Sequence, residues 1–165
     1  MILPVETWLA IASKRDLRDY ADTPIPSEVA TRILDAGRVS GSSRNTQKWE
    51  FVVVEQAKQE LSSAVYAPEN VATAALVIAI VGDAAGFDVG RASQNMMLAA
   101  WAEGVGSCPN GIADPEEAAR ICGGEVKMIL SFGYAAKPRD VNAHSADEWS
   151  ARAKRAPLDE LVRRA

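Results

Sequence analysis

Apolar residues recur along much of the chain at the spacing of one helix face. Val29, Ile33 and Ala36 follow this spacing and predict a helix over residues 26–39. A longer stripe predicts a second helix over residues 88–102. Shorter helices are expected at three further places: residues 6–13, residues 58–66, and a helix that begins at Pro115 with Asp114 as its N-cap.

Continuous apolar runs without helical spacing predict buried strands. Residues 51–54 and 75–81 are rich in valine and isoleucine, and residues 125–134 form a third run. A few strands among several helices, in irregular order, favour an α+β domain in which helices cover a sheet. The chain has 165 residues and contains no repeat or low-complexity linker. We therefore expect one domain over residues 1–165.

Composition and charge exclude several classes of partner. Hydrophobic residues make up 48% of the chain and charged residues 24%, as in ordinary globular proteins. A net charge of −4 gives no bulk attraction to nucleic acid or to an anionic membrane. The longest apolar stretch, residues 72–81, is about half a membrane span, and the first residues lack the basic region of a signal peptide. We expect a cytoplasmic protein without nucleic-acid or membrane partners.

Familiar catalytic and metal-binding motifs are absent from the sequence. The glycine-rich stretch over residues 104–111 follows a predicted helix rather than a strand, which argues against a dinucleotide-binding loop. Cys108 and Cys122 form no CxxC pair, and the single histidine, His144, lies in a polar tail. We expect two free cysteines, no metal site and no Ser-His-Asp triad.

Three polar segments remain as candidates for binding a small molecule. Asn45 and Gln47 lie in an amide-rich segment between a helix and a strand, where they could read the polar edge of a heterocycle or simply cap the helix. Paired cationic donors suit a phosphate group, although a solvated surface is the better explanation of each basic cluster when it is taken alone. The two basic clusters are Lys14, Arg15 and Arg18 near the start, and Arg152, Lys154 and Arg155 near the end.

Taken in order, these features resemble the FMN-dependent nitroreductase family, and the resemblance covers nearly all of the chain. Family members open with a pattern like R-R-S-x-R-x-F and continue with a loop like P-S-x-x-N-x-Q-P-W that enters a strand. A helix like D-x-G-x-A-x-Q-N-x-x-L-A-A, its exit G-x-G-S, a strand ending in G-Y and a final R-K-P-L-E-E-V-V follow. The corresponding segments here are residues 14–20, 40–54, 88–100, 104–107, 132–134 and 154–162.

The resemblance implies a small nitroreductase-like α+β protein with a mostly antiparallel central sheet flanked by helices. It also implies a domain-swapped homodimer, in which a C-terminal arm of about residues 140–165 reaches the partner subunit and FMN lies at the interface. The helix over residues 88–102 would present Ala92, Ala99 and Ala100 either to the partner or to the core. The implied cofactor-binding residues are Lys14, Arg15, Asp16, Arg18, Asn45, Gln47, Ser107, Lys154 and Arg155.

The implied activity is ping-pong transfer of hydride from NADH or NADPH, through the flavin, to an electron-poor small molecule such as a nitroaromatic or a quinone. The segment over residues 106–109 would pass over the flavin ring and offer backbone N–H groups to the charge of reduced flavin. No side chain has to act as acid or base, because the protein positions the rings and tunes the flavin.

Three positions depart from the family pattern. Lys48 stands where proline is usual, and only a short segment separates Asp83 from Asp88, where larger members insert helices that cover the flavin. Asp16 replaces a serine, and its carboxylate would repel phosphate unless it turns toward a neighbouring arginine. Three alternatives stay open: a flavin-storage protein without turnover, a member that has lost FMN because of Asp16, or a flavin-cleaving enzyme like dimethylbenzimidazole synthase with Asp16 catalytic.

Overall fold

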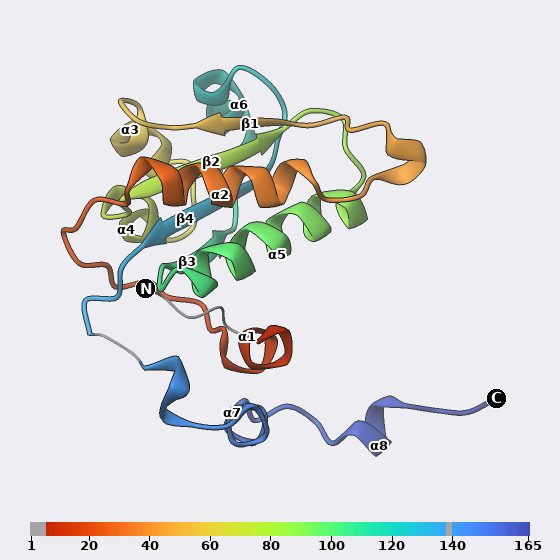
Figure 1. The fold of residues 1–165 in the computed structure, drawn as a ribbon. Coiled ribbons are helices and arrows are strands. Elements are labelled where there is room, and N and C mark those ends of the chain that lie inside the picture. Colours follow the sequence, from red (N-terminus) through yellow and green to blue (C-terminus); the bar gives the residue numbers. More distant parts are fainter. Residues whose placement is uncertain (1–5, 138–139) are drawn as a thin grey trace.

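A four-stranded antiparallel sheet forms the centre of the computed structural model, which describes residues 6–137 and 140–165 (Figure 1). The strand order is β1-β2-β4-β3. β2 and β4 occupy the middle, where continuous apolar runs are buried on both faces of the sheet. The strands are β1 (Glu50–Val53), β2 (Leu76–Val81), β3 (Gly106–Asn110) and β4 (Val126–Gly133).

Two long helices, α2 (Ser27–Arg38) and α5 (Gly86–Ala102), cover one face of the sheet. Ile33 and Met96 from these helices pack with Ile78 and Phe132 from the strands, and none of the four side chains is exposed. This packing explains the helical spacing of apolar residues, because each helix buries only one stripe. Ala92 and Ala100 are buried within the chain, so they belong to the core, whereas Ala99 is half-buried.

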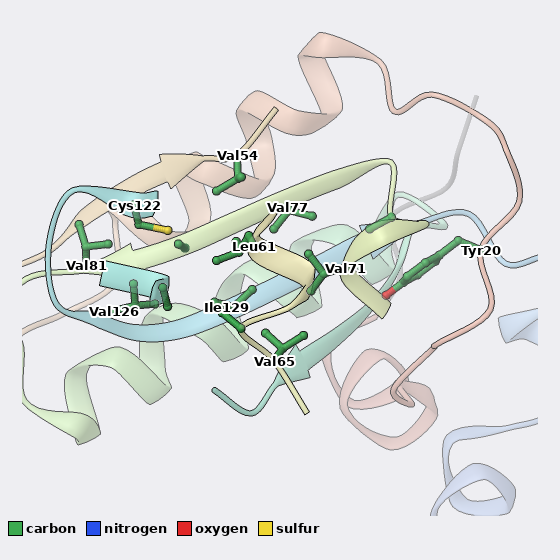
Figure 2. Close-up of a cluster of buried hydrophobic side chains, with 14 of the residues drawn as sticks. Tyr20, Val54, Leu61, Val65, Val71, Val77, Val81, Cys122, Val126 and Ile129 are labelled. Carbon is green, nitrogen blue, oxygen red and sulfur yellow. The ribbon is translucent and has the colours of Figure 1, made fainter. Parts of the chain in front are cut away.

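Three shorter helices cover the other face: α3 (Lys58–Ser62), α4 (Pro68–Ala72) and α6 (Pro115–Cys122). Figure 2 shows Leu61 and Val71 from two of them beside Val77 and Ile129 of the sheet. The remaining elements are α1 (Thr7–Ser13), which packs against α5 and α7 (Ala146–Arg152), together with the short helices η1 (Ser43–Asn45), η2 (Val141–Ala143) and α8 (Leu158–Leu161).

Most of the predicted elements are confirmed within a few residues of their bounds. Asp114 does cap α6, because its carboxylate accepts a hydrogen bond of 3.0 Å from the Glu117 amide. The helix predicted over residues 58–66 is wrong in its second half, since α3 ends at Ser62. Strand β3 was not predicted from the sequence, and it pairs with β4 along its whole length. The sequence analysis missed α4 and α7.

Candidate functional site

The first basic cluster lies in an extended segment that follows α1 and runs beside the sheet. Asp16 pairs with Ser107 of β3, and the Leu17 amide donates a hydrogen bond of 2.9 Å to the Ser107 carbonyl. A Cβ atom on Gly106 would collide with the side chain of Leu17, so this glycine makes room for the segment. The backbone around Asp16 is therefore fixed by the sheet.

Lys14 is the most buried member of the cluster. Its Nζ lies 2.5 Å from Oδ1 of Asp16 and 3.4 Å from the sulfur of Met97 on α5. The Lys14 side chain is only 8% exposed, whereas that of Asp16 is 44% exposed. The expected partner of the carboxylate was a neighbouring arginine, whereas in the structure it is Lys14.

Arg15 connects the two ends of the chain through hydrogen bonds to backbone carbonyls. Its Nη1 donates hydrogen bonds to the carbonyls of Ala12 and Lys14, at 2.7 and 2.8 Å. Its Nη2 donates one of 2.9 Å to the carbonyl of Trp149 in α7. Arg15 is therefore a structural connection between α1 and α7 in this chain, because both terminal nitrogens of its guanidinium are already bonded to backbone.

We expect Arg15→Met to loosen α7 from α1 while the sheet stays intact. A charged hydrogen bond contributes about 1.5–3 kcal/mol, so amide exchange in residues 146–152 should accelerate about tenfold. Hydrogen exchange of the full chain measures this. Arg152→Met is the matched control, because Arg152 is an exposed arginine in the same helix; equal protection in both variants would contradict the role of Arg15.

Arg18 is exposed and lies beside the sulfur of Cys108. A hydrogen bond to that sulfur raises the pKa of the Arg18 guanidinium, and the charge of Asp16 acts in the same direction. Tyr20, at the end of the segment, has its hydroxyl 2.9 Å from Oγ of Ser131, and burial raises its phenol pKa well above the usual value. Tyr20 is thus a neutral anchor, and Arg18 is a cation available at the surface.

Ser107, which pairs with Asp16 of this segment, has an unusual side-chain environment. The side chain is completely buried, and its Oγ has no hydrogen-bond partner among residues 6–137 and 140–165. Buried hydroxyl groups without a partner are uncommon in folded proteins. The structure therefore places Asp16 beside Lys14, Arg18 and Ser107 of the predicted set, whereas Arg15 bonds to backbone carbonyls.

The amide-rich loop containing Asn45 and Gln47 is exposed and conformationally strained. Arg44, Asn45 and Gln47 have φ angles of 53°, 56° and 48°, a region that residues with side chains seldom adopt. The buried carboxylate of Asp88 holds the loop by accepting a hydrogen bond of 2.9 Å from the Ser43 amide. Such strain is typical of ligand-binding loops.

This loop lies at the opposite end of α5 from the basic segment. In Figure 1 it is the orange connection between α2 and β1, whereas α1 lies below the other end of α5. Asp88 holds the loop and Met97 contacts Lys14, and these two residues are about 13 Å apart along the helix axis. A single chain therefore does not bring Asn45 and Gln47 to Lys14 and Arg18.

Lys154 and Arg155 lie in the connection between α7 and α8, and both are exposed. Neither residue forms an ion pair or hydrogen bond within the part of the chain that the structure describes. Within the predicted arm, α7 packs against α1, and the residues that follow α7 extend away from the rest of the chain (Figure 1). We call these residues, 153–165, the arm. It carries three exposed apolar side chains, Leu158, Leu161 and Val162.

A small apolar cavity of about 170 Å³ lies behind the basic segment, between Leu17, Trp101 and Tyr134. A tricyclic ring needs more room than this cavity offers. No group of three or more His, Cys, Asp or Glu residues among those described is arranged to hold a metal ion. None of the described helices has the length and apolar character to cross a membrane.

Comparison with known proteins identifies the family. A protein-family model described as "Putative TM nitroreductase" matches residues 6–165. The chain belongs to the nitroreductase family. A relative from Methanothermobacter thermautotrophicus, named "Putative NADH dehydrogenase/NAD(P)H nitroreductase", is 30% identical over 118 residues, which cover 66% of this nitroreductase-family chain and 62% of the relative. A relative of the same name from Archaeoglobus fulgidus is 29% identical over 118 residues, covering 65% and 68%.

Solved structures confirm the nitroreductase-like fold. A nitroreductase family protein from Streptococcus pneumoniae TIGR4 is 16% identical, with a TM-score of 0.80 over 94% of this chain and 98% of that one. A Desulfovibrio desulfuricans structure described as "a putative nitroreductase in complex with fmn" is 24% identical, with a TM-score of 0.78 over 98% of each chain. The predicted antiparallel sheet flanked by helices is thus confirmed, and the dimer stays a prediction.

Proposed function

We propose that this protein is an FMN-dependent oxidoreductase that transfers hydride from NADH or NADPH to an electron-poor small molecule, such as a nitroaromatic or a quinone. The observation that carries the proposal is the corner of the sheet where the segment with Lys14 and Arg18 pairs with β3 at Ser107, in a chain of the nitroreductase family. The buried Ser107 hydroxyl has no partner among the described residues. The printed names of two relatives mention NAD(P)H nitroreductase, and one structural neighbour contains FMN.

The corner fits the phosphate of FMN. Lys14 and Arg18 supply two cations from one fixed segment, and an arginine fork suits a phosphate group. The Ser107 hydroxyl is an additional donor close to the same segment, and it would gain a partner when the site is filled. Asp16 opposes the phosphate, and its carboxylate is paired with Lys14.

A homodimer would complete this site. Asn45 and Gln47 lie too far from Lys14 in the same chain, so a partner subunit would have to bring its own amide loop to the flavin. The projecting arm has three exposed apolar residues that a partner could bury. Residues 152–165 also include five basic and two acidic residues, whereas the whole chain carries −4, so the arm is attracted to the body of a second copy.

Bound FMN supplies the hydride-accepting and hydride-donating chemistry. Lys14 and Arg18 neutralise and hold its phosphate, and Lys154 and Arg155 of the arm add charge from the other subunit. Asn45 and Gln47 offer amide donors and acceptors to the polar edge of the ring. Within the described residues, Tyr20 is buried and Cys122 is a buried thiol with its pKa raised by desolvation, so neither is suited to transfer protons.

Purified protein supplied with FMN tests the proposal. We expect flavin absorbance that persists through gel filtration, and anaerobic bleaching of that absorbance by NADH or NADPH. Subsequent addition of a nitroaromatic or a quinone should restore the oxidised spectrum. Bound flavin that neither nucleotide bleaches would indicate a storage protein, and cleavage of the flavin would indicate the synthase-like alternative.

A further inference from the structure

The candidate phosphate site already contains an anion that belongs to the protein. Oδ1 of Asp16 lies 2.5 Å from Nζ of Lys14, and the lysine side chain is only 8% exposed. Among the described residues, the other hydrogen-bond acceptor of Lys14 Nζ is the sulfur of Met97. The lysine charge is thus largely neutralised before any ligand arrives, because the paired carboxylate is its nearest polar contact.

The position of Asp16 is fixed by the backbone rather than by this ion pair alone. Asp16 pairs with Ser107 of β3, and the following residue, Leu17, donates a hydrogen bond of 2.9 Å to the Ser107 carbonyl. The Leu17 side chain is buried, which prevents rotation of the segment. The Asp16 carboxylate therefore remains in the corner with Lys14 and Arg18 even when the ion pair opens.

We propose that Asp16 acts as a competing internal anion in the phosphate site and lowers the preference of this protein for FMN over unphosphorylated riboflavin. The inference rests on the proposed function, because it assumes that a flavin binds at this corner. Asp16 is a specificity-determining residue in this account, and it has no part in hydride transfer.

The physical basis is a difference in charge between the two flavins. A phosphate monoester carries about −1.5 to −2 charges at pH 7, so it must displace Asp16 from Lys14 and then remain beside a carboxylate. Riboflavin lacks the phosphate, so it does not have to displace Asp16 and is not repelled by its carboxylate. Because Asp16 is 44% exposed, solvent screens part of the repulsion, and we expect an effect of about tenfold on the affinity for FMN.

Titration of full-length protein with FMN and with riboflavin, followed by flavin fluorescence, tests the inference. We expect Asp16→Ser and Asp16→Asn each to raise the affinity for FMN about tenfold and to leave the riboflavin affinity unchanged within about twofold. The asparagine variant removes the charge while it keeps the size of the side chain. Asp19→Asn is the matched control, because Asp19 is an exposed carboxylate in the same segment and should leave the ratio of the two affinities unchanged.

The outcomes separate this inference from the proposed function. Weaker FMN binding by both Asp16 variants would mean that the carboxylate positions Lys14 for the phosphate, and it would overturn the inference. An equal change for FMN and riboflavin would overturn it as well, since only FMN carries the opposing charge. If neither flavin binds to any variant, the proposed function fails and the inference fails with it; if both bind with an unaltered ratio, the inference alone fails.

Discussion

Removal of residues 154–165 is expected to convert the proposed homodimer into a monomer and to weaken FMN binding by at least about a hundredfold. The deletion removes Lys154 and Arg155, and two charged contacts to phosphate at about 1.5 kcal/mol or more each correspond to roughly that factor. It also removes Leu158, Leu161 and Val162, the exposed apolar side chains of the arm. Sedimentation equilibrium and fluorescence titration measure the two effects.

The melting temperature of the truncated chain serves as the folding control. Residues 154–165 are exposed throughout, so their loss should leave the core and its thermal stability nearly unchanged. A second variant with Lys154→Gln and Arg155→Gln keeps the apolar residues of the arm. It should retain the dimer and lose only FMN affinity. A truncated chain that is still a dimer with full affinity would show that the arm contributes nothing to the site.

Arg18→Ala should reduce the affinity for FMN by about ten- to a hundredfold, because a charged hydrogen bond to phosphate contributes about 1.5–3 kcal/mol. Arg18 is exposed, so the loss should fall at the lower end of that range in high salt. Riboflavin affinity should change little, since riboflavin has no phosphate. Fluorescence titration at low and high salt measures both quantities.

Two further variants make the Arg18 experiment specific. Arg18→Lys keeps the charge but not the planar fork, and it should recover part of the affinity. Arg32→Ala removes an arginine on α2 that is paired with Glu103, and it should leave flavin binding unchanged. An Arg18→Ala protein with normal FMN affinity would place the phosphate elsewhere on the molecule.

The sequence predicted the elements whose apolar pattern is local, and it failed where tertiary pairing creates the element. Helix α2 and strand β2 follow directly from their apolar spacing. Strand β3 was missed because Gly106–Asn110 contains no β-branched or aromatic residue, and its extended form comes from pairing with β4 and with Asp16. Gly106 leaves room for the side chain of Leu17, and that contact could not be predicted because Leu17 lies far away in the sequence.

One missed element did leave a signal in the sequence. Ser145 and Glu148 form a capping box at the start of α7, and serine followed three residues later by glutamate is the sequence signature of that motif. The use of Arg15 could not be predicted in this way. Its partner is the Trp149 carbonyl, and because every residue has a backbone carbonyl, no residue type in the sequence marks this partner. The same holds for Asp88, whose partner is the Ser43 amide.

The contact between Arg15 and α7 limits which surface of a second subunit the arm can reach. Since α7 is anchored through the Trp149 carbonyl, the arm starts from a defined point on the surface. Five residues lie between Arg152 and Leu158, and the six Cα steps of a fully extended chain span at most about 22 Å. Any groove that receives α8 must therefore open within that radius, and lengthening the linker, rather than altering the groove, would be the direct way to change which surface is reached.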